Sequence, residues 1–134
     1  MEIIVLVGIP GSGKSTLALT RFPQHQRISL DIVHTRKRED DEIASCLKNN
    51  KDIIIDNTNS TVKSRKKYVE LAKLYGASVR AVYLKCPIDL ALQRNSSRNG
   101  KERIPDNAVR FYNKILKPPT LEEGFDCVEE IIVK

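Results

Sequence analysis

Residues 2–18 read EIIVLVGIPGSGKSTLA, and this stretch decides the fold class. Its first six residues are almost all apolar, which is typical of a strand buried on both faces of a parallel sheet. A glycine-rich turn follows, and KSTLALTRF (14–22) then predicts a short helix that Pro23 ends. A strand, a glycine loop and a helix in this order predict the start of an α/β protein.

The turn has the spacing Gly8-x-x-x-x-Gly13-Lys14-Ser15, which fits a phosphate-binding loop. Glycines let successive N–H groups curl inward around an anion, and the helix that follows adds its positive N-terminus. In such a loop the lysine reaches the β- and γ-phosphates and the serine hydroxyl binds Mg²⁺. A chance match on a glycine-rich turn is the alternative, and the flanking strand and helix argue against it. We therefore expect the loop to hold a nucleoside triphosphate through Gly11, Ser12, Gly13, Lys14, Ser15 and Thr16.

Strand-like and helix-like segments alternate along the rest of the chain. Further strands are predicted at 26–31, 51–56, 77–84 and 125–134, and further helices over 37–50, 60–75, 87–98 and 105–117. This alternation predicts one domain, residues 1–134, with a parallel sheet of about five strands flanked by helices and covered by a helical lid. In such sheets ligands bind beyond the carboxyl ends of the strands.

Charge and cysteine content narrow the partners and the compartment. A formal net charge of +6 over 134 residues favours an anionic partner such as a nucleic acid, a nucleotide or a membrane surface, although a merely basic protein would look the same. The only apolar N-terminal run is too short to span a membrane. The three cysteines match no metal or disulfide pattern, which predicts a reducing, intracellular compartment.

Two aspartates follow predicted strands, where a ligand would bind. Asp31 closes QRISLD and Asp56 closes KDIIID. A kinase that acts on a hydroxyl needs a base near the acceptor, and Asp31 is placed to supply it. Asp56 is placed to face Mg²⁺ through water. The alternatives are a helix cap or turn residue for Asp31 and a turn residue for Asp56.

Arg94 and Arg98 stand four residues apart in LQRNSSR and therefore share one helix face. Two neighbouring guanidinium groups repel each other unless an anion or solvent separates them, and their forked geometry matches phosphate oxygens. We predict that both arginines clamp a bound triphosphate. A solvated basic helix is the alternative.

Taken together, these residues resemble the kinase domain of the polynucleotide 5′-hydroxyl kinase family. The matching segments occur in the family's order and cover nearly the whole chain: GIPGSGKSTLA, ISLD, IIIDNTN, SRKKYVELAKLYG, LQRNSSR, IPDNAVRFY and PPTLEEGF. DNTN and the arginine pair are the more discriminating pieces, since many kinases share the glycine loop. Some relatives place segments like PPTLEEGF near the nucleobase.

The resemblance implies a role for each matching residue. Asp31 matches the base that takes the proton of a 5′-hydroxyl, and Lys14 and Ser15 match the phosphate lysine and the metal ligand. Asp56 matches an aspartate in the water shell of Mg²⁺ (or Mn²⁺), while Arg94 and Arg98 match the lid arginines. The implied partners are ATP or another nucleoside triphosphate and a DNA or RNA end with a free 5′-hydroxyl.

The chain departs from the family's pattern beside the base. Leu30 stands where an arginine is common, and His34 stands where some members carry an arginine that binds the acceptor phosphate. Arg36 and Arg38, with Lys37 between them, are predicted to bind the acceptor instead. A second basic cluster, 63–67, either tracks a nucleic acid or forms a solvated face.

Two other functions remain open from the sequence. A small-molecule kinase acting on a sugar, nucleoside or antibiotic shares the glycine loop, the strand-end aspartate and the lid arginines. A nucleotide-binding regulatory module would share the loop but has no need of an acceptor base.

Overall fold

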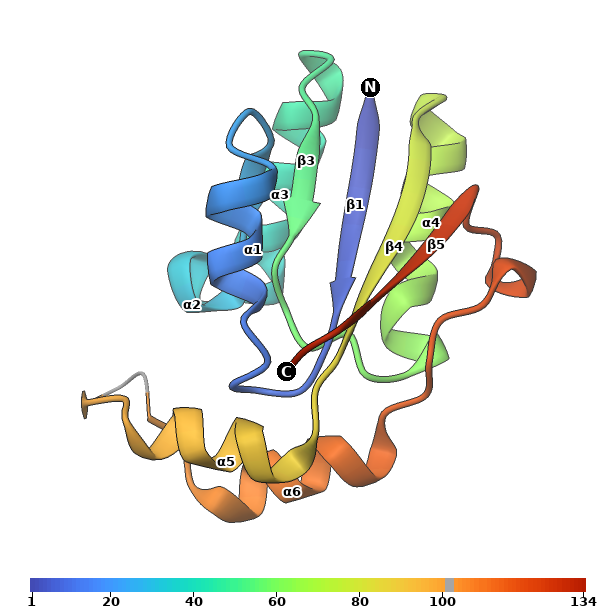
Figure 1. Cartoon of the computed structure of the whole chain (residues 1–134). Helices are drawn as coiled ribbons and strands as arrows, with labels where there is room; N and C mark the ends of the chain where they lie inside the picture. The colour runs from blue at the N-terminus through green and yellow to red at the C-terminus, as the bar shows by residue number, and fades with distance from the viewer. Residues whose placement is uncertain (101–102) are drawn as a thin grey trace.

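The computed structural model describes residues 1–100 and 103–134, and its centre is one parallel five-stranded sheet (Figure 1). The strands lie in the order β2-β3-β1-β4-β5 and all pairs are parallel. Their bounds are β1 Glu2–Val7, β2 Gln26–Ile28, β3 Ile53–Ile55, β4 Ser78–Lys85 and β5 Cys127–Ile132. The predicted α/β fold with five parallel strands is thus confirmed.

Helices cover both faces of this sheet because β1, in its middle, is apolar on both sides. Ile4 and Leu6 pack with Ala18 of the helix that follows the glycine loop, whereas Ile3 and Val5 pack against the opposite layer. In Figure 1 α1 lies on one face, and α3 and α4 lie on the other. The helices are α1 Lys14–Arg21, α2 Leu30–Val33, α3 Arg36–Lys48, α4 Val62–Tyr75, α5 Ile88–Ser96, α6 Asp106–Ile115 and the 3₁₀ turn η2 Leu121–Glu123.

The lid consists of α5 and α6, which lie beyond the carboxyl ends of the strands (Figure 1). Ala91 of α5 and Val109 of α6 are fully buried in one small apolar cluster with Ile9 of the glycine loop. Asn95 is also buried, and its side-chain amide both donates to and accepts from the backbone of Ile104. The lid is therefore tied internally and packed on the loop. Across the described residues no helix is long and apolar enough to cross a membrane.

The prediction that a strand runs to Asp31 is wrong. Strand β2 ends at Ile28, and Asp31 lies in the first turn of the short helix α2. Ser29 is extended, and its hydroxyl accepts a 3.2 Å hydrogen bond from the backbone N–H of Asp31, so it caps the helix. His34 ends α2 in the left-handed region with φ 68°. The alternation of residues 26–31 carries no signal that separates a long strand from a short strand followed by one capped turn.

Candidate active site

The glycine loop joins β1 to α1 at the carboxyl edge of the sheet and touches the lid. Gly11 and Gly13 both have positive φ values, 87° and 97°, which side chains rarely tolerate. A Cβ on Gly11 would lie 2.6 Å from the backbone oxygen of Ala91 in α5. Glycine at position 11 therefore permits both the curl of the loop and the close approach of the lid helix.

Lys14 is folded back over this loop. Its Nζ donates two 3.0 Å hydrogen bonds, to the backbone oxygens of Gly8 and Ile9. The pKa of Lys14 is lowered to about 8, chiefly because the ammonium is buried; Asp56 and Asp31 raise it, and the charge of Arg98 adds to the lowering. Since removal from water is what disfavours the charged ammonium, an anion bound beside Lys14 would favour its charged form.

Ser15 and Asp56, the two predicted metal-site residues, lie against each other. The Ser15 hydroxyl donates a 2.9 Å hydrogen bond to Oδ2 of Asp56, whose side chain is 3% exposed. The described residues contain no group of three or more His, Cys, Asp or Glu side chains able to hold a metal. Mg²⁺ commonly binds through one or two protein oxygens together with waters and substrate phosphates. A hydroxyl beside a buried carboxylate fits that pattern.

A third residue, Arg27 of β2, joins this pair, and sequence reasoning missed it. Its Nε donates to Oδ2 of Asp56 at 2.7 Å and its Nη2 donates to the Ser15 hydroxyl at 3.1 Å. Arg27 pairs in register with Ile54, which packs on the α1 side of the sheet. Residues in register on neighbouring strands face the same side, so Arg27 also faces α1, whose first turn carries Ser15. A charge inside an otherwise strand-like segment was the available signal.

Arg94 of α5 and Arg98 both lie beside the glycine loop, but α5 ends at Ser96, so the prediction that the two arginines share one helix face is wrong. The Nη1 of Arg94 is 3.4 Å from the backbone oxygen of Ser12 and would lie 3.5 Å from a Cβ on Gly13. Both arginines line a cavity of about 410 Å³, a size suited to a small ligand. Its other lining residues come from the loop, α1 and β4: Gly11, Ser12, Gly13, Thr16, Leu17, Thr20 and Leu84.

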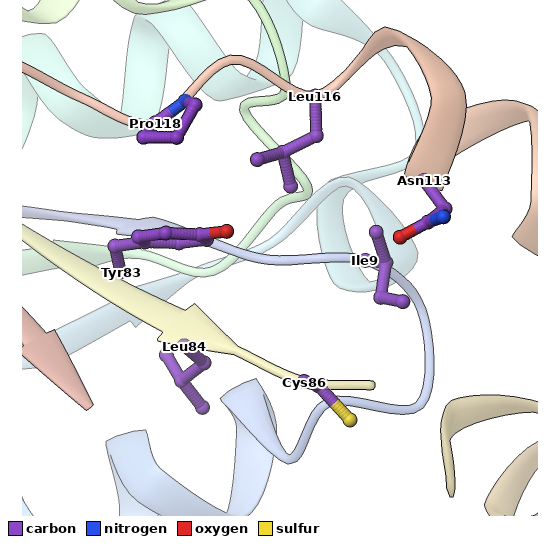
Figure 2. A pocket seen from close by; sticks show the side chains of 7 residues that line it. All are labelled: Ile9, Tyr83, Leu84, Cys86, Asn113, Leu116 and Pro118. Atoms are coloured by element: carbon purple, nitrogen blue, oxygen red, sulfur yellow. The ribbon is translucent and has the colours of Figure 1, made fainter. Parts of the chain in front are cut away.

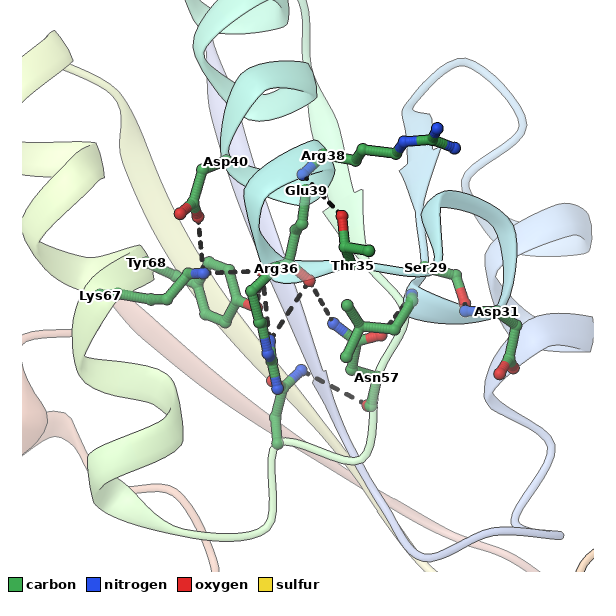
Figure 3. Close-up of polar contacts among 12 residues, drawn as sticks. Ser29, Asp31, Thr35, Arg36, Arg38, Glu39, Asp40, Asn57, Lys67 and Tyr68 are labelled. Atoms are coloured by element: carbon green, nitrogen blue, oxygen red, sulfur yellow. Dashed lines mark hydrogen bonds and ion pairs between the residues drawn. The ribbon is translucent and has the colours of Figure 1, made fainter.

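Asp31 is exposed on α2, and a buried polar cluster positions that helix (Figure 3). The side chain of Asn57 accepts a 2.9 Å hydrogen bond from the backbone N–H of Leu30 and donates one of 2.9 Å to Glu39. Figure 3 shows the Asp31 carboxylate pointing away from this cluster. Its charge reaches Lys14, whose pKa it raises. Asp31 in α2, which follows β2, and Lys14 in the first turn of α1, which follows β1, both lie in segments at the carboxyl edge of the sheet.

Glu39, at the centre of the cluster, is fully buried on α3. Burial by itself raises the pKa of its carboxyl, but hydrogen bonds from Lys67, Tyr68 and Asn57 outweigh this and hold the pKa below its ordinary value. Sequence reasoning also missed this residue. Glu39 lies on the same helix face as Ile43 and Leu47, four and eight residues on, so helical spacing carried the signal.

The two basic clusters, residues 36–38 and 63–67, do not form one continuous positive surface for an acceptor, because several of their side chains are paired or buried. Arg36 is paired with Glu39 at 3.2 Å, whereas the guanidinium of Arg38 extends away from the cluster (Figure 3). In the 63–67 cluster Arg65 is fully buried, and Lys67 is paired with Glu39 and with Asp40. Arg38 and the exposed Lys37 are therefore better placed than Arg36 to meet an acceptor.

A second, smaller cavity of about 110 Å³ lies between the glycine loop, β4 and the end of the lid (Figure 2). It is lined by Ile9, Tyr83, Leu84, Cys86, Asn113, Leu116 and Pro118. Beyond Pro118, the segment PPTLEEGF packs on α4, where Glu123 binds Arg65. None of the segment's residues lines the larger cavity beside Arg94 and Arg98, so that cavity gives no support to a nucleobase contact by PPTLEEGF.

A glycine loop between the first strand and the first helix of a parallel sheet, under a lid that carries arginines, defines the class of P-loop proteins with a kinase fold. Within this class the chain belongs to the AAA domain family, whose model matches residues 3–119.

Two curated relatives resemble this chain in sequence, and one solved structure resembles it in fold. The chain is 36% identical, over 99% of its length, to the bifunctional polynucleotide phosphatase/kinase of Schizosaccharomyces pombe, and 34% identical, over 97%, to a putative one of Acanthamoeba polyphaga mimivirus. It spans about a third of each, 34% and 33% respectively. These matches confirm the resemblance predicted from the motifs. A gluconokinase from Sinorhizobium meliloti shares the fold, with a TM-score of 0.69 at 20% identity over 98% of this chain and 82% of that one.

Proposed function

We propose that this chain transfers the γ-phosphate of ATP or another nucleoside triphosphate to the 5′-hydroxyl end of a nucleic acid. The observation that supports a nucleic-acid acceptor is the 36% identity, over 99% of the chain, to a polynucleotide phosphatase/kinase. The site is consistent with it, because a carboxylate, a phosphate lysine and two lid arginines converge on the carboxyl edge of the sheet.

Each side chain has a defined task in this reaction. Asp31, exposed on a braced helix, accepts the proton of the attacking hydroxyl. Lys14 leaves its two backbone acceptors for the β- and γ-phosphates, and Arg94 and Arg98 neutralise charge on the transferring group from the lid side. Ser15 and, through water, Asp56 would hold Mg²⁺, which would supply electrostatic stabilisation of the phosphates.

The acceptor strand would approach beside α2 and the first turn of α3. Lys37 and Arg38 are exposed there, and His34 lies just before them. Arg36 is less available, since reaching a phosphate would require it to leave the buried carboxylate of Glu39. This arrangement suits contacts to one or two phosphates near the 5′ end rather than to a long stretch of strand.

A small-molecule kinase is the second candidate, and one observation favours it. Arg36, Arg65 and Lys67, which the sequence offered as cations for a polynucleotide, are already paired with acidic side chains. The gluconokinase likeness, at 20% identity, bears on the fold alone and does not choose between the two acceptors.

The test is transfer of a labelled γ-phosphate to matched acceptors. We expect transfer to 5′-hydroxyl DNA or RNA oligonucleotides and weaker transfer to a nucleoside 3′-monophosphate. A plain nucleoside, gluconate and a 5′-phosphorylated oligonucleotide should accept little or nothing. Lys14→Ala serves as the inactive control. Efficient transfer to a sugar or free nucleoside would replace the polynucleotide proposal with the small-molecule one, and nucleotide binding without transfer to any acceptor would support a regulatory module.

A further inference from the structure

The Arg27 guanidinium stands between the two side chains that the fold assigns to a divalent cation. It donates to Asp56 at 2.7 Å through Nε and to the Ser15 hydroxyl at 3.1 Å through Nη2. Ser15 also donates to the same Oδ2 of Asp56, so the Ser15 hydroxyl oxygen and Oδ2 of Asp56 both already have polar partners. A positive group therefore sits where a metal would sit.

A metal ion with its water shell and this guanidinium would compete for these oxygens. Mg²⁺ binds oxygen at about 2.0–2.1 Å and holds its waters in a near-octahedral shell, which leaves no room for an N–H donor on the same lone pairs. The two cations also repel each other, most strongly beside a buried carboxylate where solvent screens little. Metal binding at the Ser15 hydroxyl, with a metal-bound water on Asp56, would thus weaken the hold of Arg27 on both side chains.

Arg27 is placed so that it can leave these side chains. It belongs to β2, an edge strand of the sheet, and its side chain is 25% exposed, whereas the Asp56 side chain is 3% exposed. Rotation of the arginine side chain would return its guanidinium to water without disturbing the strand. Asp56 has no such freedom, because it follows the buried strand β3.

We propose that Arg27 is a placeholder cation, which positions Ser15 and Asp56 in the nucleotide-free protein and is displaced when a metal–triphosphate binds. In the free protein Arg27 neutralises the buried Asp56 carboxylate and keeps Ser15 turned toward it. It also competes with a bare divalent cation, so the site takes its metal efficiently only together with a triphosphate. This inference rests on the metal–nucleotide part of the proposed function and is independent of the acceptor.

The first test measures Mn²⁺ binding to the nucleotide-free protein. The concentration of free Mn²⁺ is monitored by electron paramagnetic resonance during the titration. Arg27→Gln should bind Mn²⁺ tighter than wild type by roughly three- to tenfold, because charged hydrogen bonds no longer have to be broken. Adding Asp56→Asn should abolish that gain. Arg21→Gln is the matched control, since Arg21 of α1 forms a similar two-point pair with Glu129, outside the site. It should bind Mn²⁺ as wild type does.

The second test uses the wild-type protein and so does not depend on how the variant folds. The Arg27 Nε–H should be protected from exchange in nuclear magnetic resonance spectra of the free protein and should lose that protection when Mg²⁺ and a non-hydrolysable triphosphate are added. Equal or weaker Mn²⁺ binding by folded Arg27→Gln, or an Nε–H that stays protected in the complex, would overturn the proposal. Neither experiment contains an acceptor, so failure of the polynucleotide assignment would leave both results standing.

Discussion

The guanidinium of Arg65 in α4 and the carboxylate of Glu123 in η2 form a buried two-point ion pair. The Nε and Nη2 atoms donate to the two carboxylate oxygens at 2.8 and 3.0 Å, and the side chains are 0% and 8% exposed. Nη1 also donates to the backbone oxygens of Asn59 and Lys117, both at 2.9 Å. This one arginine therefore connects α4, the loop after β3 and the segment that leaves the lid.

Arg65→Met should lower the free energy of unfolding by about 3–5 kcal/mol, because it leaves a buried carboxylate without its cation, with only the Thr120 N–H as a donor, and leaves two carbonyl groups without their side-chain donor. Urea denaturation measures this directly. Lys66→Met is the control, since Lys66 is exposed and forms only a 3.8 Å pair with Glu70. It should change stability by about 0.5 kcal/mol or less. Equal effects for the two variants would mean that Arg65 contributes no more than a surface charge.

Lys14 should make nucleotide binding depend on pH. Burial lowers its pKa in the free protein to about 8, whereas a bound triphosphate favours the charged form. Binding should therefore take up protons near pH 8, and affinity should fall as the pH rises above that value. The unfolded chain, in which the pKa is near 10.5, binds more protons between pH 8 and 10.5, so the free protein should become more stable over that range.

Calorimetry of a non-hydrolysable triphosphate in buffers of different ionisation enthalpy measures the proton uptake. Lys14→Ala should bind weakly and lose the pH dependence above 8. It should also lose phosphoryl transfer while keeping the fold, because the Lys14 ammonium contacts only backbone oxygens of the loop. Near wild-type transfer by the folded variant would show that Lys14 does not act on the phosphates.

Asp31→Asn should retain nucleotide binding and lose transfer, since an amide of similar size accepts no proton at neutral pH. Loss of a general base costs about 10²–10⁴-fold in rate. The rate at saturating nucleotide and acceptor, with melting temperature as the control, is the measurement. An unchanged rate would leave Asp31 as nothing more than a first-turn residue of α2, next to its Ser29 cap.

Arg94→Ala and Arg98→Ala should each lower the transfer rate far more than they lower stability. Their proposed partner is the triphosphate, which the free protein lacks, and substitutions of partly exposed residues away from the core usually change stability by about 0.5 kcal/mol or less. Single-turnover rates and melting temperatures of the same preparations compare the two effects. A lower melting temperature with transfer intact would make the pair structural.

Lys37→Ala and Arg38→Ala should make oligonucleotide binding less sensitive to salt. Each lost phosphate contact reduces the slope of log affinity against log salt by about 0.7 for a single strand. Lys48→Ala, at the far end of α3, supplies the matched control and should leave the slope unchanged. If all three variants keep the wild-type slope, the acceptor does not lie along the first turn of α3.

The sequence by itself determined the glycine loop and the order of the five strands and the longer helices along the chain, because these depend on local periodicity and on backbone freedom. The prediction that Arg94 and Arg98 share one helix face is wrong, since α5 ends at Ser96 and Arg98 lies two residues beyond it. Ser15 and Asp56 were also expected to share a site, since parallel strands end at a common edge.

What only the tertiary structure decided is which charges are already paired. Arg27 with Asp56, Arg65 with Glu123 and Arg36 with Glu39 all resemble free cations when the chain is read along its length. Two of these pairs join residues 29 and 58 positions apart, and no local pattern encodes them. Packing brings each cation to a buried carboxylate, because a carboxylate that leaves water must find a positive or hydrogen-bonding partner.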